Sequence, residues 1–155
     1  MPEISPQSET ETRQLVVFVL GAEEYALPIR SVQEVIRYQQ PRAVASSDTT
    51  LLGVINLRGQ IVPVHDVRST LGLTASGDGE SEKIVLINAD DSMAGVVVDD
   101  VSEVLTVSGS EFEDLPASGN PIVEGVFKVE ERLIIMLDPI ALTGLAGSDL
   151  GEAPG

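Results

Sequence analysis

The stretch LLGVINLRGQIVPVHDVRSTLGL (51–73) shows how the chain is organised, because a related pattern, VEGVFKVEERLIIMLDPIALTGL (123–145), follows 72 residues later. Five of the 23 aligned positions are identical, and six more pair one apolar residue with another. Upstream, SVQEVI (31–36) matches DVSEVL (100–105) at three of six positions. The shared order and spacing predict two structural copies within one chain.

The segments inside each copy have the pattern of β-strands. They are short, rich in β-branched residues and bounded by turn-forming residues. No ten-residue segment has the spacing of an amphipathic helix, although SVQEVIR (31–37) could form one short helical turn. The clearest strands are LVVFVL (15–20), IVLI (84–87), VVV (96–98) and RLIIML (132–137). Many short strands predict small barrels or sandwiches.

Both copies end in a pattern typical of a short capped helix. Asp66 and Asp138 stand at matching positions and are good N-caps, and Pro139 suits the first helical position. Gly72 and Gly144 can end the segment in a left-handed conformation. We therefore interpret both aspartates as structural.

Two linkers and two tails follow from composition. TASGDGESE (74–82) predicts a tether between the copies, and LPASGNP (115–121) predicts a loop within the second copy. Residues 1–13 and 147–155 are expected to be disordered tails. Each copy has only ~60 residues, which is marginal for a separate core, so we expect the copies to pack together as one folding unit.

The charge excludes several classes of partner. The chain has 25 Asp and Glu against nine Lys and Arg, so nucleic acid and anionic membrane surfaces are poor partners. Residues 1–68 carry a net charge of −2, and residues 69–155 carry −14. The first half could therefore provide a contact surface, while the second keeps the protein soluble. We expect no direct membrane insertion, because the longest apolar runs are too short to span a bilayer.

The same composition suggests where the protein works. Cysteine is absent, and the polar N-terminus has no signal-peptide pattern, so we expect a cytoplasmic location. Only two of the nine basic residues are lysine, and an acid-rich, lysine-poor surface suits a salty cytoplasm, where charges are strongly screened. We therefore hypothesise a halophilic source. Equal melting temperatures in dilute and in molar KCl would contradict that hypothesis.

Catalytic and metal-binding patterns are weak. The paired Asp66 and Asp138 resemble the dyad of aspartic proteases, but the small residues that let such carboxylates approach each other do not follow them. His65 is the single histidine, which excludes a two-histidine metal site and favours a structural or surface role. The doublets Asp90–Asp91 and Asp99–Asp100 lack calcium-loop spacing and are interpreted as solvated turns. We expect no enzyme, no cofactor and no metal.

Arg58 is the feature that the repeat does not preserve. The pair Arg58–Gly59 aligns with Glu130–Glu131, although the apolar positions around it persist. The fold therefore does not need a cation at this turn. Two interpretations stay open: a solvated turn residue, or a function carried by the first copy alone.

The quoted run, preceded by YALPIRSVQEVIR (25–37), resembles the CheW family, the coupling proteins of prokaryotic chemotaxis. The likeness extends from about Gln14 to Leu145. It implies a mostly β fold of two SH3-like, five-stranded β-barrels packed together through a hydrophobic seam, with a few short helices. The domain would cover 14–146, with barrels at approximately 14–74 and 83–146 and a strand exchange between them left open.

The resemblance also implies a non-catalytic adaptor. It would couple the cytoplasmic tips of methyl-accepting chemoreceptors to the regulatory domain of the histidine kinase CheA, after recruitment to membrane-associated signalling arrays. An alternative is a CheW-like scaffold for a different histidine-kinase pathway, such as pilus-based motility. A third hypothesis is an enzyme using the paired aspartates, whose activity Asp66→Asn and Asp138→Asn would abolish.

The family's motifs select five receptor-binding candidates. Arg58 matches the arginine of the NLRG motif and Glu34 the glutamate of VQEV, and both belong to the family's receptor-contacting region. Val32 and Gly53 match neighbouring positions, and Asn56 is a further candidate. We expect Glu34 to hold the Arg58 guanidinium, which could then donate to carboxylates or terminal carbonyls of a receptor helix. No motif marks the kinase-binding face, which stays unassigned.

Overall fold

The computed structural model describes residues 12–47, 49–68, 71–73, 82–89, 92–114 and 122–142. These residues form eleven β-strands, two 3-10 helices and one short helical turn at 139–142. The strands are β1 (Thr12–Leu20), β2 (Glu23–Pro28), β3 (Val32–Arg37), β4 (Leu51–Leu57), β5 (Gln60–His65), β6 (Lys83–Ala89), β7 (Ser92–Val98), β8 (Asp100–Ser108), β9 (Phe112–Asp114), β10 (Val123–Val129) and β11 (Arg132–Leu137), and the 3-10 helices are η1 (Ile29–Ser31) and η2 (Gly109–Glu111). The mostly β fold predicted from the sequence is confirmed.

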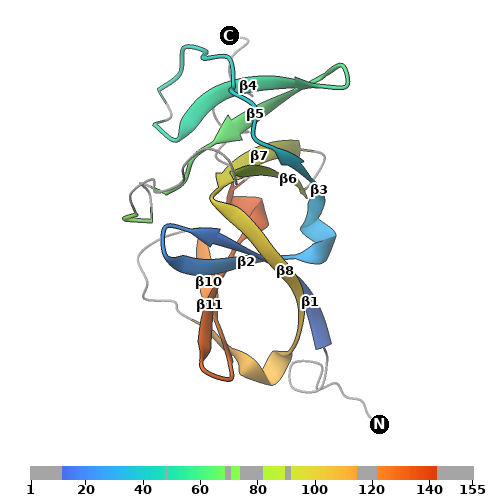
Figure 1. Cartoon of the computed structure of the whole chain (residues 1–155), viewed down its shortest axis with the longest axis vertical. Coiled ribbons are helices and arrows are strands. Elements are labelled where there is room, and N and C mark those ends of the chain that lie inside the picture. The colour runs from blue at the N-terminus through green and yellow to red at the C-terminus, as the bar shows by residue number, and fades with distance from the viewer. Residues whose placement is uncertain are drawn as a thin grey trace.

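The strands form two sheets, one above the other in Figure 1. One sheet has the order β3-β6-β7-β5-β4, and the other has the order β8-β1-β2-β11-β10-β9. Hairpin β1–β2 therefore lies in the sheet built mainly from the second half of the chain, and hairpin β6–β7 lies in the sheet built mainly from the first. Two parallel pairings, β5 with β7 and β11 with β2, join these hairpins to their sheets.

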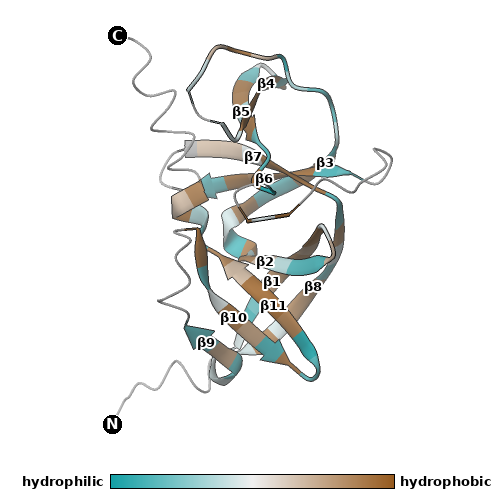
Figure 2. Ribbon diagram, turned by 90° about the vertical axis from the view of Figure 1, so that its left-hand side faces the viewer, coloured by the Kyte–Doolittle hydropathy of each residue, from teal (hydrophilic) through white to brown (hydrophobic). Residues whose placement is uncertain are grey.

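Three apolar clusters account for the core. One cluster lies within each sheet, around Phe127 in the six-stranded sheet and around Val62 in the five-stranded one. The third cluster joins both sheets, because Phe18 and Leu20 of β1 meet Val85 and Ile87 of β6 there. Alternate residues of β1 and β6 thus face different clusters, as the two-residue repeat of a strand requires. Figure 2 shows the hydrophobic stretches in the strands of both sheets. The shared cluster is the apolar seam that the family resemblance implied.

The duplicated glycines explain part of the repeat. A Cβ atom on Gly53 would lie 2.1 Å from the backbone oxygen of Arg42, and one on Gly125 would lie 2.5 Å from the Phe112 ring. Arg42 forms an isolated antiparallel bridge with Val54, and β9 pairs with β10 at the matching place. Both glycines therefore let a further strand segment approach closely. Because that segment is a full strand only beside β10, one sheet has six strands and the other has the expected five.

Two local expectations are corrected. Residues 32–37 form strand β3 with alternating burial, so the helical turn proposed for 31–37 is wrong, and η1 ends at Ser31. Strand β1 begins at Thr12, within the segment 1–13 that was expected to be a tail. Of the predicted linkers and tails, 115–121 and 147–155 lie outside the described residues, as does 74–82 except for Glu82. Among the described residues, no helix is long and apolar enough to cross a membrane.

Candidate functional site

The tip of the β4–β5 hairpin is a tight turn with left-handed backbone. Arg58 has φ 51° and Gly59 has φ 89°, which are the values of a type I′ turn, the type that matches the twist of paired strands. The backbone N–H of Gly59 donates to Oδ1 of Asn56 at 2.9 Å. Asn56 therefore stabilises the turn. Arg58 occupies a left-handed backbone position, which glycine and asparagine adopt more readily than arginine does.

Arg58 and Glu34 form a two-pronged ion pair at the surface. The Nη2 atom of Arg58 is 2.5 Å from Oε1 of Glu34, and Nη1 is 3.3 Å from Oε2. These hydrogen bonds and the carboxylate charge raise the pKa of the Arg58 guanidinium. The Arg58 side chain is nevertheless 67% exposed, against 33% for Glu34. The expected pairing is confirmed, and it orients a cation that stays open to solvent.

This ion pair spans the five-stranded sheet. Glu34 lies on β3, one edge of the sheet, and Arg58 lies at the turn that joins β5 to β4, the opposite edge. The sheet must curl for the two side chains to meet, and Figure 1 shows β3 and the β4–β5 turn on the same side of the molecule. A recess of about 400 Å³ beside the turn is lined by Gln39, Gln40, Arg42, Val54, Ile55, Asn56 and Ile61. The tip thus combines an oriented cation with a hollow.

The other two candidates have structural surroundings. Val32 is partly buried and packs against the cluster shared by the sheets. Gly53 is buried, with φ 153°, and the space that a Cβ atom would need there is taken by the Arg42 carbonyl oxygen. The structure therefore brings Arg58, Glu34 and Asn56 together at the hairpin tip, whereas Val32 is partly buried and Gly53 is buried. Whether any of the five contacts a receptor stays a prediction.

The matching turn in the second copy has a different ion pair. Glu130 has φ 59°, so the left-handed position is retained. The cation stands two residues later, where Arg132 donates to Glu24 at 2.8 Å and to Glu103 at 2.7 Å. The sequence alignment of the two copies matched Glu130 with Arg58 but missed Arg132. The available signal was an arginine at the first position of the strand predicted at 132–137, next to the turn.

A buried ion cluster, which the sequence analysis missed, ties the two halves together. The Arg68 guanidinium is 2.8 Å from Asp66, 2.5 Å from Asp99 and 3.4 Å from Glu82, and its side chain is 6% exposed. Asp99 also accepts a hydrogen bond from the backbone N–H of Gly21 at 2.6 Å. Asp99 is 7% exposed, so its interpretation as a solvated turn residue is wrong, whereas Asp100 is exposed as expected. Asp90 and Asp91 lie outside the described residues.

The capping role of Asp138 is confirmed, whereas Asp66 makes the same type of side-chain contact with the backbone but no helix is described after it. Oδ1 of Asp138 accepts from the backbone N–H of Ile140 at 3.0 Å, and Pro139 begins the short helical turn. Oδ1 of Asp66 accepts from the Arg68 N–H at 3.0 Å. Burial alone would raise the pKa of Asp66, but the hydrogen bonds and charge of Arg68 outweigh it and lower that pKa. These contacts account for both carboxylates without a reaction. Gly72 has the expected left-handed φ of 78°, and Gly144 is not among the described residues.

His65 has a structural position. It is 1% exposed, and its Nδ1 atom lies 2.7 Å from the Thr50 hydroxyl oxygen. The matching residues in the second copy are Leu137 and Ile122, both buried. A polar contact in one copy thus replaces an apolar contact in the other. Among the described residues, no three metal-binding side chains converge on one point.

Comparison with known proteins identifies the family. The family model for the CheW-like domain matches residues 14–146. The chain is 32% identical over 133 residues to Chemotaxis protein CheW of Bacillus subtilis, covering 83% of this chain and 85% of that protein. It is 31% identical over 134 residues to Chemotaxis protein CheW of Klebsiella aerogenes, covering 84% and 81%.

A solved structure agrees with this assignment. The crystal structure of the scaffolding protein TtCheW from Thermoanaerobacter tengcongensis superimposes with a TM-score of 0.76 at 30% identity, covering 81% of this chain and 88% of that one. TtCheW is a scaffolding protein, and the two relatives are chemotaxis proteins. The sequence match covers the duplicated run with its turn arginine, and the structural match covers most of the curled pair of sheets. This chain belongs to the CheW-like family.

Proposed function

We propose that this protein is a non-catalytic chemotaxis adaptor that couples chemoreceptor cytoplasmic tips to the regulatory domain of the histidine kinase CheA. It works in the cytoplasm and is recruited to membrane-associated receptor arrays. Membership of the CheW-like family supports the adaptor role. The observation that supports a receptor contact is the exposed Arg58 guanidinium, held by Glu34 at the tip of a rigid hairpin.

The physical argument concerns orientation. A long side chain loses conformational entropy when it binds a partner, and an arginine that is already held in place loses less. Arg58 spends two donors on Glu34, while three of the five N–H groups of a guanidinium remain for a partner. A receptor tip is a helical hairpin that offers carboxylates and terminal carbonyls to such a donor. The adjoining recess, lined in part by Ile61, provides apolar surface to cover.

The test is co-sedimentation of the protein with a chemoreceptor signalling fragment and with the kinase, for wild type and for Arg58→Glu. We expect Arg58→Glu to lose receptor binding at least about tenfold while kinase binding and the circular dichroism spectrum stay unchanged. The fold should tolerate the change, because Glu130 occupies the matching turn position with φ 59°. Lys128→Glu, an equal change of charge on an exposed residue of β10, is the control.

Three outcomes would separate the hypotheses. Unchanged receptor binding by Arg58→Glu would remove this residue from the receptor site. Binding of wild type to another histidine kinase but not to CheA would favour the alternative scaffold role, including a pilus-based pathway. An activity abolished by Asp66→Asn or Asp138→Asn would contradict the non-catalytic proposal.

A further inference from the structure

We infer that Arg13 and Arg30 form a second cationic contact, a recess that binds carboxylate side chains of the chemoreceptor hairpin. This inference rests on the proposed function and extends it from the hairpin tip to the start of β1 and to η1. The recess has a volume of about 610 Å³ and is lined by Thr12, Arg13, Gln14, Pro28, Ile29, Arg30 and Thr106. Of these seven described lining residues, two are arginine and none is acidic.

Arg13 and Arg30 are two of the four basic residues, with Arg37 and Arg42, that form no ion pair within the described part of the chain. Of the nine lysines and arginines, five take part in ion pairs within the described part of the chain, namely Arg58, Arg68, Lys83, Lys128 and Arg132. Arg13 and Arg30 have no ion-pair partner among the described residues, and both side chains belong to exposed residues. In a chain of net charge −16, two such guanidiniums on one recess mark a place where negative charge is accepted.

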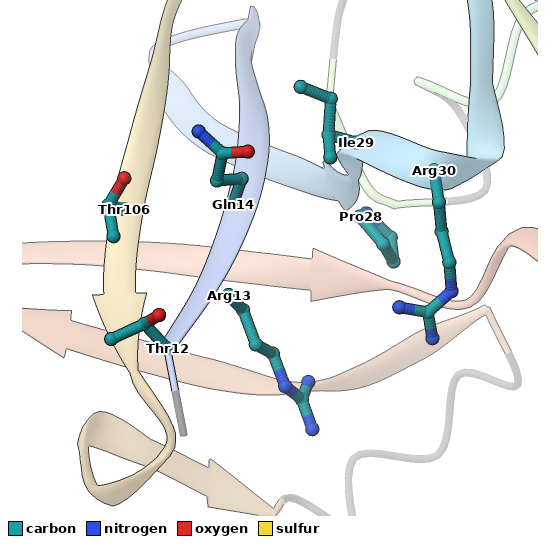
Figure 3. Close-up of a pocket in the computed structure, with 7 residues that line it drawn as sticks. All are labelled: Thr12, Arg13, Gln14, Pro28, Ile29, Arg30 and Thr106. Atoms are coloured by element: carbon teal, nitrogen blue, oxygen red, sulfur yellow. The ribbon is translucent and has the colours of Figure 1, made fainter. Parts of the chain in front are cut away.

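The Arg13 and Arg30 side chains lie on the same side of the recess. Figure 3 shows Arg13 reaching from β1 and Arg30 from η1 in a similar direction, with Pro28 between them. The Arg13 guanidinium carbon lies 5.9 Å from the centroid of the Phe112 ring, which gives that side chain an aromatic support. Arg30 is fixed at its base by η1, where the neighbouring Ser31 is buried. Both cations are thus presented from ordered backbone.

The acids near this recess lie to one side. Arg13, Pro28 and Arg30 also line a neighbouring recess of about 420 Å³, whose wall contains Glu124 and Asp138. Burial and the nearby Asp138 raise the pKa of Glu124, while Arg13 acts in the opposite direction. Among the described residues, these acids line only the second recess. A partner carboxylate that enters the first recess therefore approaches both guanidiniums from the side that Glu124 and Asp138 do not line.

The recess lined by Arg13 and Arg30 suits a protein segment better than a free anion. Ile29 is 39% exposed at the first recess and Ile140 is 59% exposed at its neighbour, so a polypeptide could cover apolar surface at the same time. Arg30 also precedes Glu34 by four residues, and η1 leads directly into β3. One chain segment, η1 with β3, thus carries both Arg30 of the recess and Glu34, which holds Arg58. A helical hairpin that contacts Arg58 could reach this second contact.

The test measures the affinity of the full-length protein for a receptor signalling fragment and, separately, for the kinase regulatory domain. The variants are Arg13→Glu, Arg30→Glu and the control Lys128→Glu, which changes the charge equally. We expect Arg13→Glu and Arg30→Glu each to weaken receptor binding by about fivefold and to weaken its dependence on salt. Kinase binding should stay unchanged, which also shows that the variants are folded.

Charge exchange provides a second measurement. A receptor fragment with lysine in place of a tip glutamate should bind Arg30→Glu more tightly than it binds wild type, if the two residues meet. Receptor affinities of Arg13→Glu and Arg30→Glu equal to that of Lys128→Glu would overturn the inference and leave the proposed function standing. Absence of receptor binding by wild type would overturn the proposed function itself. Release of the receptor by phosphate, but not by chloride at equal ionic strength, would assign the recess to a small anion instead.

Discussion

The β4–β5 and β10–β11 turns share a left-handed backbone position, but a cation occupies it in the first turn and an anion in the second. Arg58 and Glu130 both occupy a left-handed position, with φ 51° and 59°. In the second turn the cation has moved two residues on, to Arg132, where two carboxylates hold it and its side chain is 33% exposed. In the first turn one carboxylate holds the cation, and its side chain is 67% exposed. The turn itself therefore needs neither charge, and what differs between the copies is the availability of the guanidinium.

At the end of each copy, it is the first copy that has buried polar residues where the second has apolar ones. His65 contacts Thr50 in the first copy, where the second has Leu137 and Ile122. Arg68, which matches the exposed Ile140, is buried among three carboxylates. In the first copy, Arg68 is therefore a buried arginine that stabilises the fold. Arg58, at the hairpin turn of the same copy, is an exposed arginine that is available for binding. Substitutions that convert one copy into the other can separate these roles.

The largest effect on stability is expected from Arg68→Ile, which introduces the residue found at the matching position of the second copy, Ile140. Removing this guanidinium leaves Asp66, Glu82 and Asp99 without their shared cation in a mostly buried site. We expect a loss of about 3–5 kcal/mol in the free energy of unfolding, measured by urea denaturation at neutral pH. Arg37→Ile, at an exposed strand position, should change it by less than about 0.5 kcal/mol.

The pH dependence of that loss sharpens the prediction. The folded-state pKa of Asp66 is lowered by Arg68, so its contribution is fully present above the ordinary Asp pKa and is lost as the pH falls through the lower folded value. The difference between wild type and Arg68→Ile should therefore shrink on acidification. A difference that is independent of pH would mean that lost packing, rather than lost ion pairs, dominates.

A smaller loss is expected at the repeated glycines. Gly53→Ala would place a Cβ atom 2.1 Å from the Arg42 carbonyl oxygen, and Gly125→Ala would place one 2.5 Å from a Phe112 ring carbon. The Gly125 Cβ would also lie 2.6 Å from the backbone oxygen of Glu113, so both substitutions push against backbone. The approach is closer at Gly53, and Gly53 also has a positive φ of 153°, so we expect about 3 kcal/mol for Gly53→Ala and less for Gly125→Ala in thermal or urea unfolding. Gly72→Ala is the matched control, because its φ of 78° costs about 1 kcal/mol but its surroundings are open. Equal effects of all three would show that close approach is not what the repeat preserves.

The repeat explains which features could be predicted from the sequence. Short β-branched runs, the Asp138 cap and the Arg58–Glu34 pair are each encoded within one copy or by its motifs. The sheet order is not, because hairpins β1–β2 and β6–β7 pair with strands of the other half. Such long-range pairings leave no mark in local periodicity. Asp99 shows the consequence, since its partner Arg68 lies 31 residues away and its own neighbours suggest only a turn.

Strand β3 shows a different limit. In its sequence, VQEVIR, exposed residues alternate with partly buried ones, but Val35 is on the exposed side and Glu34 is on the partly buried side. Polarity therefore does not follow burial in this short segment, and its sequence cannot separate a strand from a helical turn. Pairing with β6 decides in favour of a strand, including the register shift between Val32 and Glu34. That shift lies next to Glu34, the residue that holds Arg58. The local sequence suggested the ion pair, but only the tertiary pairing places it at the curled edge of the sheet.

The smallest effect on stability is expected from moving the cation within the first turn. The variant Arg58→Glu/Gln60→Arg gives this turn the charge order of the second, where Glu130 precedes Arg132 by two residues. The introduced arginine should pair with Glu34 as Arg132 pairs with Glu103, so we expect the melting temperature to stay within about 2 °C of wild type. Receptor binding should remain as weak as in Arg58→Glu, because the cation would lie along the strand instead of at the exposed tip. Recovery of receptor binding would show that the receptor needs only a positive charge near this turn. The left-handed position of residue 58 would then have no special role in presenting that charge.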